Sequence, residues 1–226
     1  MGSVKDLKVI KPPQEKEEGV GDFTFTDRYS VFDWGKMPDL LDDKGKSLCL
    51  IGAYFFELFE KEGIPTHYLG LVQEGKMVSL TEISQPVDTM RVRLLRVIHP
   101  QFKEGEYDYS SYRETKSNFL LPLEVIYRNI LIENSSLFKR IKKGEVDYRN
   151  LGFTDEPLPG EPLERPIFDV STKLESSDRY ISWKEAQKIS NISDTEIGKI
   201  KSILQHVNAI ITRETEKLNV KNVDGK

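Results

Sequence analysis

The 226-residue chain lacks most of the residues that build disulfides, metal clusters and membrane spans. Its one cysteine, Cys49, excludes an intrachain disulfide, and its place in an apolar run indicates an inert core thiol rather than a nucleophile. The histidines, His67, His99 and His206, are isolated from one another, so no metal-ligand spacing is present. No apolar run reaches about 18 residues, so the sequence predicts no transmembrane helix.

An excess of positive charge is also missing. Lys and Arg number 33 against 37 Asp and Glu, which gives a formal net charge of −4. A general nucleic-acid binder needs a basic surface, so this balance argues against one, although it leaves room for a local basic pocket. The G-x-S-x-G and Walker A motifs are absent as well. These absences predict a cytoplasmic protein with small-molecule partners, without nucleic-acid or membrane partners.

The first part of the chain predicts antiparallel strands and one helix. Leu7–Ile10 and Asp22–Thr26 read as strands of a hairpin, because apolar and polar residues alternate in the second of them. Residues 45–62 predict a helix that Gly63 ends. The first half of this helix is apolar nearly all round, so we expect it to be buried. Three further strands are expected over residues 66–72, 77–80 and 90–98.

The second part begins with a polar, tyrosine-rich stretch, residues 99–118, which predicts a surface excursion or a subunit contact. Residues 121–132 are the most apolar stretch and predict a central strand. Prolines from 157 to 166 indicate an extended segment. Two C-terminal helices carry capping-box spacings. We therefore expect an α+β fold with two lobes, an antiparallel β lobe with one helix (residues 1–92) and a mixed α/β lobe (residues 93–226).

Two islands in the N-terminal part could carry chemistry. Residues 2–6 (GSVKD) place a glycine and a lysine at the head of a strand, where backbone N–H groups and one cation can hold a phosphate. The alternative is a frayed terminus. Residues 27–35 (DRYSVFDWG) gather two acids, an arginine and a serine among aromatic residues. A structural turn is the alternative there.

Two more islands lie in the second part. In the predicted strand PLEVIYRN, Glu124 and Arg128 share a face with Ile126, because side chains alternate along a strand. Buried charges need partners, so the alternatives are an internal ion pair and an arginine aimed at a substrate anion. The following SSLFKR, residues 135–140, suits a phosphate. The fourth island, STKLE at 171–175 with Asp178 behind it, is either a site or a solvated loop.

In their order along the chain these islands resemble the SAICAR synthetase family, phosphoribosylaminoimidazole-succinocarboxamide synthases. DRYSVFD matches the family's D-R-x-S-x-x-D motif in full, and PLEVIYRN matches P-x-E-V-x-x-R-N. GSVKDL occupies the place of the family's glycine loop. Further family motifs are matched by GIPTH, SSLFKR and STKLE. The matches are collinear over nearly the whole chain. Each is weak alone, but the ordered set is specific.

The resemblance implies a SAICAR synthetase-like fold with an ATP-grasp- or kinase-like nucleotide cleft. It also implies an ATP-dependent ligase of purine biosynthesis that uses ATP and Mg²⁺. Such an enzyme joins L-aspartate to carboxyaminoimidazole ribonucleotide (CAIR) through an acyl phosphate. A carboxylate is a poor acyl donor, so phosphorylation supplies the leaving group. The site must gather several anions, which requires cations and N–H groups placed in advance.

The resemblance also implies roles for individual residues. The ATP-binding set is Gly2, Val4, Lys5, Val92 and Arg93. The set implied to act in catalysis is Asp33, Lys44 and Arg128. The substrate-binding set is Asp27, Arg28, Ser30, Gly45, Glu124, Ser136, Arg140, Lys173 and Asp178, with Ser136 and Arg140 at the 5′-phosphate.

Departures from the family pattern leave alternatives open. Ser3 replaces a lysine of the glycine loop, Ser135 replaces a glycine, and the family's histidine of an H-D pair has no counterpart directly before Asp178. The sequence ends in what looks like half of a family strand, so we expect a truncated chain with the Mg²⁺ ligands beyond Lys226. The alternatives are a non-catalytic nucleotide- or ribonucleotide-binding homologue and a ligase for another amino acid. Another copy of the chain is a further candidate partner, in a homo-oligomer.

Overall fold

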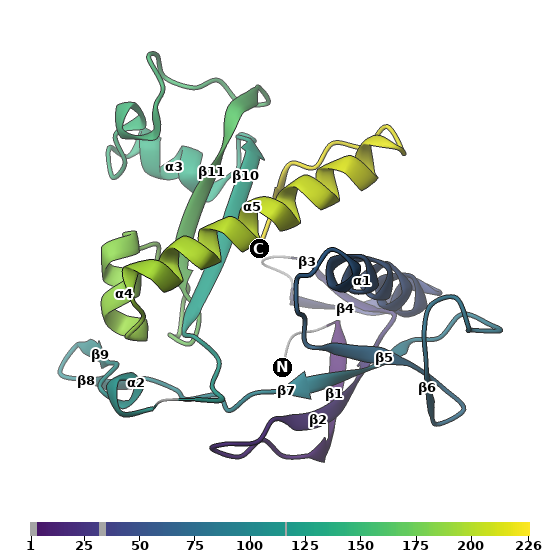
Figure 1. Cartoon of the computed structure of the whole chain (residues 1–226). Helices are drawn as coiled ribbons and strands as arrows, with labels where there is room; N and C mark the ends of the chain where they lie inside the picture. The colour runs from purple at the N-terminus through teal and green to yellow at the C-terminus, as the bar shows by residue number, and fades with distance from the viewer. Residues whose placement is uncertain (1–3, 32–34, 116) are drawn as a thin grey trace. The chain divides into compact units, whose positions relative to one another are not determined.

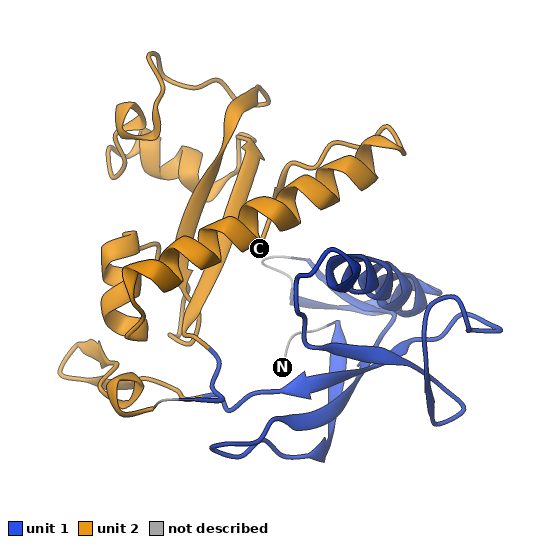
Figure 2. Cartoon of the chain, viewed as in Figure 1, with its two compact units in different colours: residues 1–97, 116–120 blue, residues 98–115, 121–226 orange. Residues whose placement is uncertain are grey.

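The computed structural model describes residues 4–31, 35–115 and 117–226, and the chain falls into two compact units. Unit 1 holds residues 1–97 and 116–120, and unit 2 holds residues 98–115 and 121–226 (Figure 2). The expected boundary at residues 92 and 93 falls inside a strand of unit 1, β7 (Thr89–Leu94). The assignment of separate roles to residues 1–92 and 93–226 stays a prediction.

Unit 1 is built on a five-stranded antiparallel sheet (Figure 1). The strand order is β1 (Lys5–Lys11), β2 (Gly19–Phe25), β7, β5 (Tyr68–Gln73) and β6 (Lys76–Val78). Antiparallel pairing of β1 with β2 confirms the predicted hairpin. Gly75 has φ +79 in the turn between β5 and β6, a conformation that favours glycine.

Helix α1 (Lys44–Lys61) packs on this sheet through a narrow stripe of small side chains. Cys49 and Ala53 are fully buried against a cluster formed by Tyr68, Leu71, Met90 and Val92. The expectation that the first half of the helix is buried all round is wrong. Leu48, Ile51 and Tyr54 are 37%, 56% and 42% exposed, because the sheet contacts only the side of the helix that carries Cys49 and Ala53.

A two-stranded ribbon precedes α1, formed by β3 (Arg28–Val31) and β4 (Gly35–Leu40). No sequence pattern indicated β4, whose residues GKMPDL do not alternate and include a proline. Proline is compatible with a strand at an edge, and a two-stranded ribbon consists only of edges.

Unit 2 is built on a three-stranded antiparallel sheet in the order β11 (Pro162–Thr172), β10 (Leu123–Ile130) and β12 (Asp224–Gly225). The central position of β10 confirms the strand predicted over residues 121–132. Two short elements follow β10 in the chain, α3 (Ser136–Lys142) and the 3₁₀-helix η2 (Tyr148–Leu151).

The two C-terminal helices of unit 2 are α4 (Trp183–Ser190) and α5 (Asp194–Glu216). Their caps confirm the sequence spacing: Ser182 accepts a hydrogen bond from the backbone of Glu185, and Ser193 and Glu196 form a complete capping box. The buried side of α4 packs with Val170 of β11, and α5 is bonded to β10 through Asn208.

The tyrosine-rich excursion forms a hairpin of β8 (Gln101–Lys103) and β9 (Glu106–Asp108), followed by the short helix α2 (Ser111–Glu114). It is not purely superficial, because Tyr112 is fully buried and donates a hydrogen bond to the carbonyl of Ile98. Burial raises the pKa of Tyr112 to about 12. Tyr109 donates to Glu175 (2.7 Å), so the excursion supports the loop that follows β11.

Candidate functional site

One face of the sheet in unit 2 collects charged side chains. Glu124, Ile126 and Arg128 alternate on this face of β10, as predicted from the sequence. The antiparallel register puts Ser171 opposite Glu124 and Asp169 opposite Ile126. On the other side, β12 puts Asp224 opposite Arg128. The fold thus assembles acids, an arginine and a serine from three strands on one surface, which we call the arginine face.

Arg128 is the centre of the arginine face and is only 3% exposed. Its Nη2 donates to Ser136 Oγ (2.9 Å) and to the hydroxyl of Tyr180 (3.3 Å). Carboxylates lie slightly beyond hydrogen-bond distance, with Asp169 3.6 Å from Nη2 and Asp224 3.7 Å from Nη1. The buried guanidinium therefore has counter-charges, as burial requires, without tight ion pairs.

Arg140 of α3 joins the same group. It forms an ion pair with Asp169, and its guanidinium carbon lies 4.0 Å from the ring centroid of Tyr180. Asp169 thereby serves both arginines, and Tyr180 contacts both as well. Three sequence-predicted residues, Arg128, Ser136 and Arg140, are brought together here.

Some buried hydrogen-bonding groups of the arginine face have no partner among the described residues. The Nε atoms of Arg128 and Arg140 and the hydroxyl of Ser171 are buried and have no protein partner. Buried polar groups are nearly always bonded, so open donors in a cluster need an explanation. Guanidinium donors bind carboxylates and phosphates with charge-assisted hydrogen bonds. The arrangement can receive a small anion.

Lys173 and Asp178 lie with Glu124 in a second charged group. Lys173 Nζ is 3.0 Å from Glu124 and 3.9 Å from Asp178, and Lys226 Nζ is 2.8 Å from Glu124. Burial would raise the pKa of Glu124, but hydrogen bonds from Lys226 and Lys173 outweigh it and hold this pKa below the ordinary value. Glu124 is therefore a carboxylate at neutral pH.

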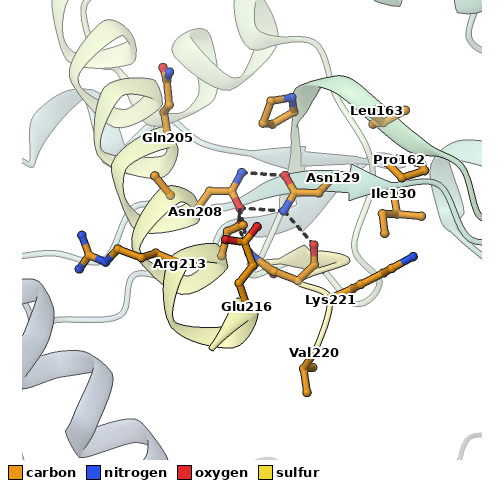
Figure 3. Close-up of a pocket in the computed structure, with 14 residues that line it drawn as sticks. Asn129, Ile130, Pro162, Leu163, Gln205, Asn208, Arg213, Glu216, Val220 and Lys221 are labelled. Atoms are coloured by element: carbon orange, nitrogen blue, oxygen red, sulfur yellow. Dashed lines mark hydrogen bonds between the residues drawn. The ribbon is translucent and has the colours of Figure 1, made fainter. Parts of the chain in front are cut away.

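The opposite face of β10 has a different character. Asn129 and Asn208 exchange two amide hydrogen bonds of 2.8 Å, and Asn222 donates to Asn208 and to Thr212 at 2.9 Å (Figure 3). These side chains line a pocket of about 680 Å³ with mostly apolar walls. We call them the amide cluster. None of its side-chain amides is without a partner among the described residues, so it is a structural link between α5, β10 and the strand that ends the chain.

In unit 1, several predicted site residues have structural partners. Asp27 accepts a hydrogen bond from the backbone of Gly45 (2.8 Å), and Arg28 pairs with Asp6 (2.5 Å). Lys44 Nζ donates to the carbonyls of Arg28 (2.8 Å) and Thr26 (3.2 Å). These contacts fasten the start of α1 to the sheet.

The close contact at the start of α1 requires a glycine at position 45. A Cβ at Gly45 would lie 2.5 Å from the carbonyl oxygen of Phe25, closer than real Cβ contacts. Ser30 lies exposed on β3. The roles of these residues in substrate binding or catalysis stay predictions.

Lys5 begins β1 and is a partly buried cation. Its ammonium lies 4.2 Å from the ring centroid of Phe23, and it forms no ion pair among the residues that the structure describes. Burial lowers the pKa of Lys5. Desolvation, followed by the charges of Lys5 and Arg93, also lowers the pKa of His67. An uncompensated, partly buried ammonium is suited to binding an anion. The neighbouring Val4 carbonyl accepts from the backbone of Thr26 (2.9 Å).

Val92 and Arg93 lie in β7, which is paired on both sides. Gly21 and Tyr68 flank Val92, and the N–H of Arg93 donates to the carbonyl of His67 (2.7 Å). Their predicted contact with ATP stays a prediction, and this pairing leaves their backbone groups fewer free positions for it. Gly2 and Asp33, predicted for ATP and for catalysis, lie outside the described residues.

Asp169, Tyr180 and Asp224 are the residues of the arginine face that sequence reasoning missed. Asp169 becomes a neighbour of Arg128 only through the register of β11, and Asp224 only through that of β12. A usable signal existed for Asp169, because it lies two positions before Ser171 and so shares its strand face. Tyr180 had no such signal.

The described residues contain no cluster of three or more His, Cys, Asp or Glu side chains that could hold a metal ion. No Mg²⁺ cage built from protein ligands alone is therefore present among these residues. No helix among them is both long and apolar enough to cross a membrane.

The fold and the arginine face define a two-unit α+β protein with a cluster of buried arginines and open donors on one sheet. The family model for SAICAR synthetase matches residues 14–226, and the chain belongs to that family. A protein of Archaeoglobus fulgidus, provisionally named phosphoribosylaminoimidazole-succinocarboxamide synthase, is 52% identical over the whole chain and 66% of its own length. The synthase of Thermoplasma volcanium is 32% identical over 90% of this chain and 60% of its own.

Solved structures agree on the fold. A SAICAR synthetase in complex with ADP superposes with TM-score 0.64 at 24% identity, over 99% of this chain and 71% of that one. The enzyme of Pyrococcus horikoshii gives 0.63 at 24% identity, over 97% and 72%. The α+β fold predicted from the resemblance is thereby confirmed. The chain spans about 60–66% of the length of these curated relatives.

Proposed function

We propose that the chain acts in the ATP-dependent joining of L-aspartate to CAIR, which gives SAICAR, ADP and phosphate. The observation that carries the proposal is Arg128, whose buried guanidinium has an unpartnered Nε next to Arg140 and Ser136. Membership of the family and the relatives' names support the chemistry. Cytoplasm is the expected location.

The arginine face has the groups needed to hold the ribonucleotide. Arg128 and Arg140 offer guanidinium donors, and Ser136 offers a hydroxyl, to the 5′-phosphate. Fixing the phosphate at one end orients the reactive carboxylate at the other, and such orientation lowers the entropic part of the barrier. Lys173 contacts Glu124 and Asp178, and we assign this group to the sugar or the imidazole ring.

The reaction has two balanced steps. An oxygen of the CAIR carboxylate attacks the γ-phosphorus of ATP, and the bond to the β-phosphate oxygen breaks to release ADP. The amine of aspartate then attacks the acyl carbon, loses a proton, and inorganic phosphate leaves. We assign the nucleotide to unit 1, where Lys5 is a cation without an ion pair among the described residues. Mg²⁺ enters with ATP as part of the substrate.

Phosphate release tests this proposal. The chain is supplied with CAIR, L-aspartate and Mg²⁺–ATP, and each is omitted in turn, with a full-length relative as the positive control. Release that needs all three substrates is the expected result. Release without CAIR or without aspartate would contradict the ligase chemistry, and binding of neither CAIR nor ATP in a calorimetric titration would contradict the assignment as a whole.

A further inference from the structure

We propose that the phenol oxygen of Tyr180 is an internal stand-in for an oxygen of the bound anion, so that Tyr180 sets the affinity of the arginine face for phosphate monoesters. The inference rests on the proposed function, because it concerns the same site. It adds a specificity residue from outside the sequence motifs.

Two donors of the arginine face converge on this oxygen. Ser136 Oγ donates to the Tyr180 hydroxyl at 2.5 Å, and Arg128 Nη2 donates to it at 3.3 Å. Both donors belong to the set proposed for the 5′-phosphate. A serine hydroxyl has one hydrogen, so Ser136 cannot donate to Tyr180 and to a ligand oxygen together. A ligand that uses Ser136 must replace Tyr180 as its acceptor.

The backbone of Tyr180 is fixed, whereas its side chain is only half-buried. Ser171 and Tyr180 form an antiparallel bridge, and the N–H of Ile181 donates to the carbonyl of Val170 (3.1 Å). The ring lies against the guanidinium of Arg140, with 4.0 Å from its carbon to the ring centroid. A rotation of the side chain therefore suffices to move the phenol oxygen away from Ser136 and Arg128, and the ring can stay near Arg140.

The hydrogen bonds to the Tyr180 hydroxyl favour anionic ligands over neutral ones. A neutral phenol oxygen accepts weaker hydrogen bonds from a guanidinium than an ionised oxygen does. A phosphate monoester offers three ionised or partly ionised oxygens and outcompetes Tyr180, whereas a neutral ligand gains little by replacing one acceptor with another. The cost of displacing Tyr180 is about one neutral hydrogen bond.

Calorimetric titration of Tyr180→Phe with ribose 5-phosphate is the test. The variant keeps the ring against Arg140 and removes the oxygen, so the Kd is expected to fall about fivefold, the effect of one neutral hydrogen bond. Tyr127→Phe is the matched control. It removes a hydroxyl that donates to Asn222 (3.0 Å) in the amide cluster, and its Kd should equal that of the unmodified chain.

A double-mutant cycle with Ser136→Ala isolates the shared hydrogen. If Tyr180 competes for the hydroxyl of Ser136, the gain from Tyr180→Phe should shrink in the Ser136→Ala background. Melting curves of all variants, recorded in parallel, establish that each is folded.

The outcomes separate this inference from the proposed function. Weaker binding by Tyr180→Phe would overturn the inference, since Tyr180 would then be a ligand contact, and an unchanged Kd would overturn it too. If neither form binds ribose 5-phosphate or CAIR, the assignment of the arginine face fails and the inference fails with it.

Discussion

Arg128 and Asn129 are neighbours in β10, but they point to opposite faces of the sheet and meet different environments. On the side of Arg128, buried donors and a hydroxyl remain without partners. On the side of Asn129, three amides and a threonine bond to one another, and no buried side-chain polar atom among the described residues that line the pocket lacks a partner.

This difference is the reason for proposing the arginine face as the binding surface and the amide cluster as a structural one. A pocket of about 680 Å³ lies beside the amide cluster, so a choice by cavity alone would select that face. The buried donors without partners favour the arginine face, because an unsatisfied buried donor raises the free energy of the fold and a bound ligand can reverse this. The two faces therefore make opposite predictions for binding and for stability.

Arg128→Ala should have the largest effect. We expect the Kd for CAIR to rise about 100-fold, because charge-assisted hydrogen bonds to the phosphate are lost. Calorimetric titration measures it. Arg165→Ala, at an exposed position of β11 in the same sheet, is the control and should bind normally. An unaltered Kd in the folded Arg128→Ala variant would break the distinction between the faces.

Asn208→Ala should act on stability rather than on binding. The substitution leaves Asn129 and Asn222 without an amide partner, which we expect to lower the free energy of unfolding by about 2 kcal/mol. Urea denaturation measures this loss. The Kd for CAIR should stay unchanged below the transition, and a weakened Kd at full stability would assign binding to the amide cluster.

Unit 1 allows a smaller test of the same rule. Lys5 has no ion pair among the described residues, so Lys5→Ala should raise the Kd for Mg²⁺–ATP about tenfold, by loss of one charge contact. Lys8→Ala, an exposed lysine on the same strand, is the control. Equal Kd values for the two variants would show that Lys5 only packs on Phe23.

Glu124→Gln should give the smallest change, and one that depends on pH. The folded-state pKa of Glu124 is lowered, so its carboxylate stabilises the fold above the unfolded-state pKa, and this contribution disappears as pH falls through the folded value. Its lysine partners are about half exposed, so we expect less than about 1 kcal/mol at pH 7 and a smaller contribution at a pH below the unfolded-state pKa. Unfolding curves at both pH values measure the difference, and a pH-independent loss would contradict the ion-pair role.

The sequence predicted what local patterns determine. The apolar run and period-two alternation identified β10 and the face shared by Glu124 and Arg128. Capping boxes at Ser182 and Ser193 identified the starts of the last two helices, because a cap is a contact within one turn.

What the sequence could not predict depends on pairing between distant segments. Asp169 and Asp224 reach Arg128 only through strand register, and Tyr180 only through the bridge that holds it beside Ser171. The exposed side of α1 was missed for a related reason. Apolar composition does not show which side of a helix has a sheet against it, and in α1 it is the side with Cys49 and Ala53, flanked by Leu50 and Phe56.

The central claim is that ligand binds the arginine face and not the amide cluster. NMR of the arginine Nε–H and asparagine side-chain amide signals during a CAIR titration tests it directly. We expect the Nε–H signals of Arg128 and Arg140 to shift in a saturable way while those of the Asn129 and Asn208 amides stay in place. Shifts of the amides with unmoved arginine signals would contradict it.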